Sequence, residues 1–441
     1  MNWLHLLSPQ RMGQKIVPAE LSRSAFEQDY DRIIFSHPFR KLQDKTQVHP
    51  LPEHDFVHTR LTHSLEVSSV GRSMGKKVGE VILQRHPELG GEFSLFDLGA
   101  IVAAASLAHD LGNPPFGHAG EDAISDFFLR HPAGQEFKSL VTGVEWSELL
   151  SFEGNAQGFR ILNKDNYGLK LTCAALGAFT KYPCSASFSQ RDASKKSQKK
   201  FGFFETEKQI FSEIASHLAL IQVAPQAWSR HPLAFLVEAA DDICYSIIDL
   251  EDGCRLGLVS FDQTVDLLEP ILKQKLNRGK LSSGYGLNEK LGVLRALAIG
   301  ELIEATTRVF LDNEQQILDG EFDRALTESC PFSDALKSIS DVSFQKIYRA
   351  RHVVEIEATG HEVIPGLLHE FTQAGLCGMK NLRSRKYQNL ILLLPEEIRE
   401  EIRLRPDNVY HMLRQIIDFI SGMTDRHAVS LYRKIKGISM V

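Results

Sequence analysis

The chain of 441 residues is poor in the features that mark disulfide-stapled domains and thiolate metal sites. Its six cysteines include no Cys-X-X-Cys pair, which is the spacing of many zinc and redox motifs. Unpaired thiols of this kind are typical of a reducing compartment. The cysteine pattern therefore argues against a secreted disulfide scaffold and predicts a cytoplasmic protein.

Long hydrophobic runs are missing as well. No window approaches the stretch of about 18 uninterrupted apolar residues that predicts a transmembrane helix, and the apolar start is too short for a signal peptide. We therefore expect no membrane association. The chain also lacks an excess of positive charge, since its net charge is −6. A phosphorylated substrate would have to be held by local cationic side chains.

The sequence shows no internal repeat and no alternation of strands with helices, and 43% of its residues are apolar. Amphipathic periodicity predicts a mostly α fold, with one short β-like piece at Val353-Val-Glu-Ile-Glu. Ser and Lys dominate residues 184–202, which we predict to be a mobile loop. The first expected helix begins near Thr59 or Thr62 and runs to about Arg85. The others are 95–109 with Ser94 and Asp97 as a capping box, 121–129, 233–252 with Pro232 at its start and Gly253 at C′, 262–275, 287–319, and 409–436 with an interruption at 421–426.

The stretch 101–121 carries the strongest indication of chemistry. An almost wholly apolar helical run ends on His109 and Asp110, a Gly-Asn-Pro-Pro loop follows, and His118 and Glu121 come next. Burying a charge without a partner costs several kcal/mol or more. We therefore interpret the His-Asp pair as ligands of a divalent metal ion. Alone the pair is weak evidence, because any buried helix end can carry one.

Two further residues complete a plausible ligand set. His63 lies on an earlier predicted helix and Asp241 on a later one, so that two imidazoles and two carboxylates come from three helices. Carboxylate oxygens suit Mg²⁺ and Mn²⁺, whereas imidazoles suit softer ions, so we expect Mn²⁺ or Mg²⁺ first and other transition metals after them. We predict Asp241 rather than Asp242 as the ligand. Each residue turns a helix by about 100°, and Asp241 shares its face with Tyr245 and Asp249.

The longer motifs extend this pattern into a resemblance to a known family. His63, His109-Asp110 and a distant Asp241 match the HD metal-dependent phosphohydrolase superfamily. More specifically, the sequence resembles the deoxyguanosine triphosphate triphosphohydrolase (dGTPase) group from about residue 35 to Arg426. The matching strings are Thr59-Arg-Leu-Thr-His-Ser-Leu-Glu-Val, His109-Asp-Leu-Gly-Asn-Pro-Pro-Phe-Gly-His-Ala-Gly-Glu, Glu153-Gly-Asn-Ala-Gln-Gly, Phe201-Gly-Phe-Phe, Glu238-Ala-Ala-Asp-Asp-Ile-Cys-Tyr and Ser421-Gly-Met-Thr-Asp-Arg.

The resemblance implies a fold and an activity. The expected fold is an HD-domain helical bundle over residues 1–260, with a C-terminal helical region over 261–441 packed on it. The expected reaction is metal-dependent hydrolysis of deoxynucleoside triphosphates to deoxynucleoside and inorganic triphosphate. His118 and Glu121 become the catalytic pair, although composition alone favours an exposed loop histidine and a glutamate at a helix N-terminus. The predicted substrate-binding residues are Gln43, Arg60, Asn155, Lys181, Lys200, Tyr245 and Asp249.

Other interpretations of the sequence stay open. An HD-type nucleotidase or phosphodiesterase would use the same metal site on other nucleotides. A single-stranded nucleic-acid binding protein would use the lysine-rich loop at 195–200 beside a vestigial metal site. The resemblance further implies a homo-oligomer, often a hexamer, with a deoxynucleotide activator at subunit interfaces. The lysine-rich loop adds single-stranded DNA as a further candidate partner.

Overall fold

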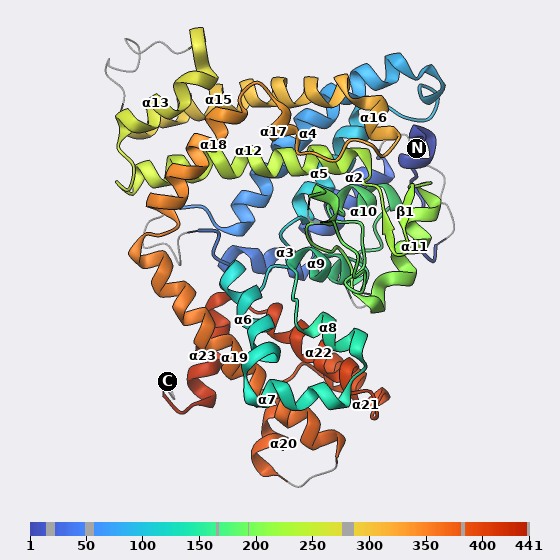
Figure 1. Cartoon of the computed structure of the whole chain (residues 1–441), viewed down its shortest axis with the longest axis vertical. Helices are drawn as coiled ribbons and strands as arrows, with labels where there is room; N and C mark the ends of the chain where they lie inside the picture. Colours follow the sequence, from blue (N-terminus) through green and yellow to red (C-terminus); the bar gives the residue numbers. More distant parts are fainter. Residues whose placement is uncertain are drawn as a thin grey trace.

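The computed structural model describes residues 1–14, 23–48, 57–164, 167–192, 194–275, 286–380 and 384–438. Most of the chain is helical, and the described residues contain a single two-stranded antiparallel sheet, β1 (Gln222–Ala224) with β2 (Ala227–Trp228). The predicted mostly α class is confirmed (Figure 1). No helix of the described residues is long and apolar enough to cross a membrane.

Three long helices occupy the centre of the upper part of the molecule in Figure 1: α4 (Arg60–Arg85), α5 (Leu95–Ala108) and α12 (Pro232–Arg255). Local signals start all three. Thr59 and Ser94 form capping boxes, and Pro232 occupies the first turn of α12. Helix α5 is buried on nearly every side, and a Cβ on Gly75 of α4 would lie only 2.8 Å from its Leu98 carbonyl oxygen. Such close packing makes α4 and α5 a rigid support.

The described residues form two large hydrophobic cores and a small third one that includes Phe201 and Phe204. The first core is built on α4, α5 and α12, and the second on α6, α19 and α22 in the lower part of Figure 1. Leu111 belongs to the first core and Phe116 to the second, so the short loop between α5 and α6 connects them. The expected domain boundary at residue 260 stays a prediction.

The remaining helices have the following bounds. In the upper part they are α1 (Trp3–Leu6), α2 (Ala25–Ile34), α3 (His37–Arg40), α9 (Gly154–Leu162), α10 (Cys173–Phe179), α11 (Lys208–His217), α13 (Phe261–Leu272), α15 (Leu287–Asp312), α16 (Glu314–Leu318), α17 (Leu326–Ser329) and α18 (Ser333–Val342). In the lower part they are α6 (Gly117–Arg130), α7 (Pro132–Gln135), α8 (Gly143–Leu149), α19 (Arg351–Met379), α20 (Arg385–Leu392), α21 (Glu396–Leu404), α22 (Val409–Ser421) and α23 (Asp425–Ile435). Short 3₁₀ turns include η1 (Lys41–Asp44), η2 (Pro87–Leu89), η3 (Glu136–Leu140), η5 (Lys196–Gln198), η6 (Glu205–Glu207) and η7 (Lys273–Lys275), and η8 (Ser343–Ile347) is a π-helical turn.

Two local predictions are wrong. The β-like piece 353–357 lies inside α19, because Val353, Gly360 and Val363 continue one buried helical face while the intervening glutamates stay exposed. Gly253 does not end α12, which continues to Arg255. The left-handed turn comes at Gly257, whose φ is +72°. Gly253 serves packing instead, since a Cβ there would lie 2.5 Å from Ile347.

The second half of 184–202 packs on the rest of the protein, and its mobility stays a prediction. Ser197 is buried, and both its backbone N–H and its hydroxyl donate to the carboxylate of Asp323, at 3.0 and 2.9 Å. Lys196 forms a 2.7 Å ion pair with Glu328. Phe201 and Phe203 are buried immediately afterwards. These contacts bring Lys200 to a defined place in the structure.

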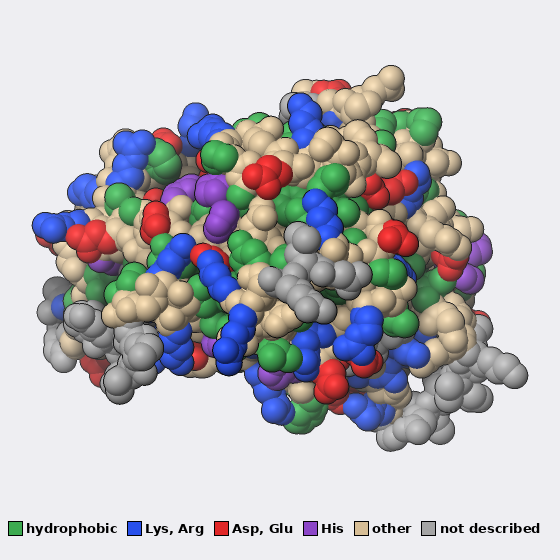
Figure 2. All heavy atoms as spheres, turned by 90° about the horizontal axis from the view of Figure 1, so that it is seen from below, with side chains coloured by type: hydrophobic (Ala, Val, Ile, Leu, Met, Phe, Trp, Pro, Cys, Tyr) green, Lys and Arg blue, Asp and Glu red, His purple; other side chains and the backbone are tan. Residues whose placement is uncertain are grey.

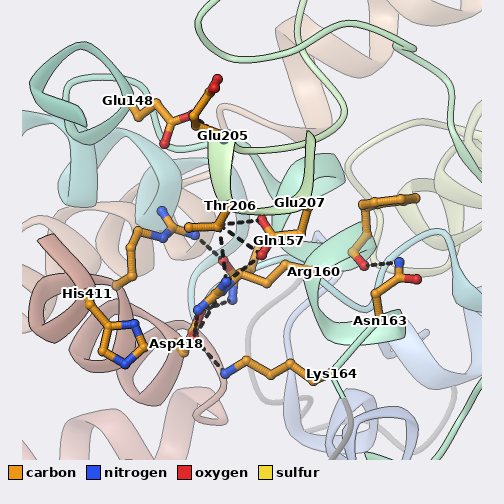
Figure 3. A network of polar contacts seen from close by, with 12 residues as sticks. Glu148, Gln157, Arg160, Asn163, Lys164, Glu205, Thr206, Glu207, His411 and Asp418 are labelled. Carbon is orange, nitrogen blue, oxygen red and sulfur yellow. Dashed lines mark hydrogen bonds and ion pairs between the residues drawn. The ribbon is translucent and has the colours of Figure 1, made fainter. Parts of the chain in front are cut away.

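A buried polar network joins α9 to α22 (Figure 3). Arg160 of α9 donates to the carboxylate of Asp418 on α22 at 2.9 Å and to Glu207 at 2.5 Å. Gln157 donates to Asp418 at 2.8 Å, and Lys164 approaches the same carboxylate at 2.6 Å. Burial would raise the pKa of Asp418, but Arg160 and Lys164 hold it well below its usual range. The network fixes α9, whose N-terminus faces the site described next.

Candidate active site

Four predicted metal ligands converge where α4, α5 and α12 meet. Ligand atoms of His63, His109 and Asp110 lie within 4.8 Å of one another. A carboxylate oxygen of Asp241 lies 3.2 Å from Nε2 of His63 and 3.5 Å from Nε2 of His109. Asp241 therefore lies beside the two imidazoles, and its role as a fourth ligand stays a prediction.

The donor set fits a divalent cation. Ligand atoms bound at about 2.0–2.2 Å from one ion lie about 3 Å apart, close to the separations seen here. Nδ1 of His109 lies 2.7 Å from the Ser106 carbonyl oxygen. Because a carbonyl can only accept, Nδ1 donates to Ser106, which leaves Nε2 as the ring nitrogen that faces the other ligands, the orientation usual for a metal-binding histidine. These residues could hold a metal ion.

Both carboxylates in this cluster are held in their charged form. Burial would raise the pKa of Asp110, but Arg60 and then His109 lower it below its usual value. Burial would likewise raise the pKa of Asp241, but His109 and His63 bring it well below its usual range. A cation requires deprotonated ligands, and both acids meet this requirement at neutral pH.

Asp242 occupies a different environment from its neighbour. Its carboxylate accepts a 2.7 Å hydrogen bond from the hydroxyl of Thr327 in α17. Burial raises its pKa to about 6. The two adjacent acids on α12 are thus separated by helical rotation, one toward the histidines and one toward α17.

Arg60 lies between the ligand cluster and the following loop. Its Nη1 donates to Asp110 at 2.9 Å, and the side chain is buried. Gly117, with φ at +57°, approaches it so closely that a Cβ there would lie 2.7 Å from Nη2. The predicted phosphate ligand is therefore also a partner of a predicted metal ligand.

His118 and Glu121 form a hydrogen-bonded pair at the start of α6. Nδ1 of His118 lies 2.8 Å from a carboxylate oxygen of Glu121. The other oxygen accepts the backbone N–H of Gly154, at the N-terminus of α9, at 2.7 Å. The Glu121 side chain is 9% exposed, whereas that of His118 is 85% exposed. The hydrogen bond to Glu121 raises the pKa of His118. An oriented, exposed imidazole held by a buried carboxylate can donate and accept protons.

Cationic and amide side chains lie near the pair, each already held by a carboxylate. Nζ of Lys200 lies 3.1 Å from Glu153 and 3.9 Å from Glu121. Asn155 donates to Glu153 at 2.8 Å. A phosphate arriving here would therefore compete with Glu153 for both side chains.

Lys181 is placed on the α12 side of the site. Its Nζ lies 3.3 Å from Glu238. Burial would lower the pKa of Lys181, but Glu238 raises it above its usual value. Gln43 lies exposed on η1.

An aromatic and acidic group lies farther along α12. The ring of Tyr245 stacks on that of Tyr348 with centroids 5.4 Å apart, and the Tyr348 hydroxyl donates to Asp249 at 2.7 Å. Burial raises the pKa of Asp249 to about 8. Tyr348 follows the π-helical turn η8, and the sequence offered no signal that placed it here. Tertiary packing alone brings it beside the predicted substrate residues.

His58 adds a second ion-paired histidine close to this group. Its Nδ1 lies 2.7 Å from Asp252 and its Nε2 lies 3.1 Å from Glu66. Burial would lower the pKa of His58, but hydrogen bonds to Asp252 and Glu66 raise it to about 10. No sequence pattern singled out this residue.

Two family models match the chain. The HD domain matches residues 60–150, which include α4, α5 and the His118–Glu121 pair, and the phosphohydrolase-associated domain matches residues 326–434. Together with the helical fold and the His-Asp cluster, these matches define an HD-domain phosphohydrolase.

Full-length relatives narrow the class. The chain is 43% identical over 452 residues to a deoxyguanosinetriphosphate triphosphohydrolase-like protein of Synechocystis sp., with all of both chains covered. It is 39% identical to a protein of the same description from Pseudomonas aeruginosa, covering 100% of this chain and 99% of the relative. It is 31% identical to a deoxyguanosinetriphosphate triphosphohydrolase of Cronobacter sakazakii, with 94% of each chain covered. The chain belongs to the HD-domain deoxyguanosinetriphosphate triphosphohydrolase-like family.

Proposed function

We propose that this protein hydrolyses deoxynucleoside triphosphates, dGTP or several of them, to the deoxynucleoside and inorganic triphosphate. The observation that carries the proposal is the placement of the His118–Glu121 pair beside the His-Asp cluster, with Arg60 between them. The printed names of the relatives support the substrate class. The lysines around the site supply the local positive charge that a triphosphate needs on a protein of net charge −6.

The proposed metal site comprises His63, His109, Asp110 and Asp241. A divalent ion bound there, Mn²⁺ or Mg²⁺ first among the candidates, would act as Lewis acid and neutralise charge on the α-phosphate. The protein's own part is to keep Asp110 ionised through its contact with Arg60 and to orient His109 through the Ser106 carbonyl, so that Nε2 faces the other ligands.

His118 is the proposed general acid and base. Water attacks the α-phosphorus, the bond from phosphorus to the 5′-oxygen breaks, and His118 protonates that oxygen. The attacking water loses one proton, which returns His118 to its protonated form, so no net proton is gained or lost by the enzyme. Glu121 holds Nδ1 and leaves Nε2 to face the leaving group. The raised pKa of His118 keeps a larger share of it in the acid form at neutral pH.

The other predicted residues would bind the rest of the substrate. Arg60, Lys181, Lys200 and Asn155 would contact the phosphates, with charge-assisted hydrogen bonds as the main attraction. Gln43 is assigned to the substrate from the sequence alone. Tyr245 and Asp249 would hold the deoxyribose, and the stacked Tyr348 supports both of them.

Product analysis tests the proposal. The purified protein is incubated with Mn²⁺ or Mg²⁺ and each of the four deoxynucleoside triphosphates, singly and in mixtures. We expect triphosphate and a deoxynucleoside. Release of pyrophosphate or orthophosphate instead would contradict the proposal and favour the nucleotidase or phosphodiesterase alternative. Faster turnover in mixtures than with single substrates would support the predicted activator site.

The predicted partners are proposals of the same kind. Light scattering tests the homo-oligomer, with a hexamer expected, and a salt titration of filter binding tests single-stranded DNA. Within the lysine-rich loop, Lys196 and Lys200 are paired with Glu328 and Glu153. On the face seen in Figure 2, Lys and Arg side chains are interspersed with Asp and Glu. Neither observation favours DNA binding as the main function.

A further inference from the structure

The loop between α5 and α6 has an unusual backbone at the point where it delivers the catalytic pair. Phe116 has φ at +65° and Gly117 has φ at +57°. A residue other than glycine in the left-handed region costs free energy and persists only where its surroundings enforce it. His118 follows directly, so this backbone sets where the imidazole stands.

Asp425, the first residue of α23, binds this loop from the C-terminal region. One of its carboxylate oxygens accepts the backbone N–H of Phe116 at 3.1 Å, and the other accepts the backbone N–H of Thr46 at 3.0 Å. Asp425 is 3% exposed. It belongs to the stretch Ser421-Gly-Met-Thr-Asp-Arg, which the sequence marked as a break between helices and as the last of the matching strings, without a role for Asp425.

Lys45 holds the other end of the same loop. Its Nζ donates to the carbonyl oxygen of Asn113 at 2.5 Å and to that of Ser421 at 2.9 Å. Asn113 in turn donates to the predicted metal ligand Asp110 at 2.5 Å. Lys45 is also 3% exposed. Together, Lys45 and Asp425 form what we call the loop clamp, which joins an N-terminal segment, the catalytic loop and the start of α23.

The packing around Phe116 agrees with this arrangement. Its ring lies against Gly360 of α19, where a Cβ would approach the ring to 3.0 Å. The backbone N–H of Phe116 donates to Asp425, and its side chain packs in the second hydrophobic core. Both halves of the residue are held by the C-terminal region.

We propose that Asp425 is a positioning residue of the active site: its carboxylate fixes the Phe116 backbone and thereby sets the place of the His118–Glu121 pair relative to the metal ligands. The inference rests on the proposed function for its kinetic part. It assigns the phosphohydrolase-associated region, to which Asp425 belongs, a direct share in the architecture of the loop between α5 and α6.

The alternative role for Asp425 is support of its own helix, since an acid in the first turn interacts favourably with the helix dipole. Thr424→Ala is the matched control. Thr424 caps α23 by accepting the His427 backbone N–H at 3.3 Å, so its loss weakens the helix start and leaves both Asp425 contacts in place. Asp425→Asn keeps the shape of the side chain, but its NH₂ group cannot accept a hydrogen bond, so one of the two backbone N–H groups loses its acceptor.

Hydrogen–deuterium exchange of the full-length protein provides the first readout. We expect Asp425→Asn to speed exchange in the peptide covering residues 111–117 by at least about tenfold, while Thr424→Ala leaves that peptide at the wild-type rate. Unchanged exchange in Asp425→Asn, or equal acceleration in both variants, overturns the inference. This readout needs neither metal nor substrate.

Steady-state kinetics provide the second readout. Misplacement of a catalytic group by about 1 Å can cost on the order of 10²-fold in rate. We expect kcat of Asp425→Asn to fall at least about tenfold with KM within about twofold of wild type, and Thr424→Ala to keep its kcat. Faster loop exchange with an unchanged kcat overturns the positioning role. If the wild type releases no triphosphate from any substrate, the proposed function fails, and the exchange comparison still decides whether Asp425 holds the loop.

Discussion

Nδ1 of His118 and a carboxylate oxygen of Glu121 lie 2.8 Å apart across one turn of α6, with the carboxylate buried and the imidazole exposed. The buried partner explains both the orientation of the histidine and its raised pKa. A second contact, from the backbone N–H of Gly154, keeps Glu121 in place. The pair thus depends on α9 as well as on its own helix.

Glu121→Gln should move the pH dependence of the reaction. The pKa of His118 is raised above its usual value, so its acid form, and the activity that needs it, persist until the pH rises through the raised pKa. The neutral amide of the variant cannot stabilise the imidazolium as a carboxylate does. We therefore expect the alkaline limb of the kcat profile to shift to lower pH and kcat to fall on the order of 10²-fold. A pH–rate profile measures both, and an unshifted limb would contradict the role of Glu121.

Asp241→Asn and Asp242→Asn form a matched pair on adjacent residues of α12. Asp241→Asn removes the charge of a carboxylate that lies 3.2 Å from His63. Asp242→Asn removes the charge of a carboxylate that accepts a hydrogen bond from Thr327. Saturating Mn²⁺ should stabilise the wild type, by about 2.7 kcal/mol at 100 times Kd. We expect thermal unfolding to show this stabilisation in wild type and Asp242→Asn, and its loss, together with activity, in Asp241→Asn. The reverse pattern would make Asp242 the ligand.

Removal of the Asp418 charge should destabilise the protein without touching the site directly. Arg160 and Lys164 would lose a buried anionic partner, which costs about 3–5 kcal/mol for a broken buried pair. Urea unfolding of Asp418→Asn measures this, with the exposed Asp407→Asn as control. Because the pKa of Asp418 is lowered in the fold, its contribution is present at neutral pH and is lost as the pH falls. The difference between variant and wild type should therefore shrink in acid.

The free energy of unfolding should fall at alkaline pH, because the contribution of charged His58 is lost there. Its pKa is raised to about 10, so its contribution is fully present below the usual histidine pKa of about 6.5 and is lost as the pH rises toward 10. Thermal unfolding from about pH 6 to about pH 9.5 should show a smaller decline in His58→Gln than in wild type. His217→Gln, at an exposed position of α11, serves as control. Parallel curves for wild type and His58→Gln would show that the ion pairs add no net stability.

Local signals in the sequence determined much of the fold. Thr59, Ser94 and Pro232 each mark a helix start because capping and proline geometry involve only neighbouring residues. The same reasoning failed at Gly253 and at 353–357, where a contact with Ile347 and the continuous buried face of α19 outweigh local preference. Local preference is weak compared with burial in a core.

The ionisable residues of the site were likewise visible in the sequence, because carboxylates and imidazoles on apolar helices need partners. Helical rotation by itself distinguishes Asp241 from Asp242, since it depends only on their adjacent positions in one helix. Only the tertiary structure decided which distant groups meet. It brought Tyr348 to Asp249 and Asp425 to Phe116, 99 and 309 residues apart along the chain. Contacts between residues so far apart in the chain arise from the packing of whole helices. They therefore produce no periodic pattern or fixed motif spacing from which the sequence could predict them.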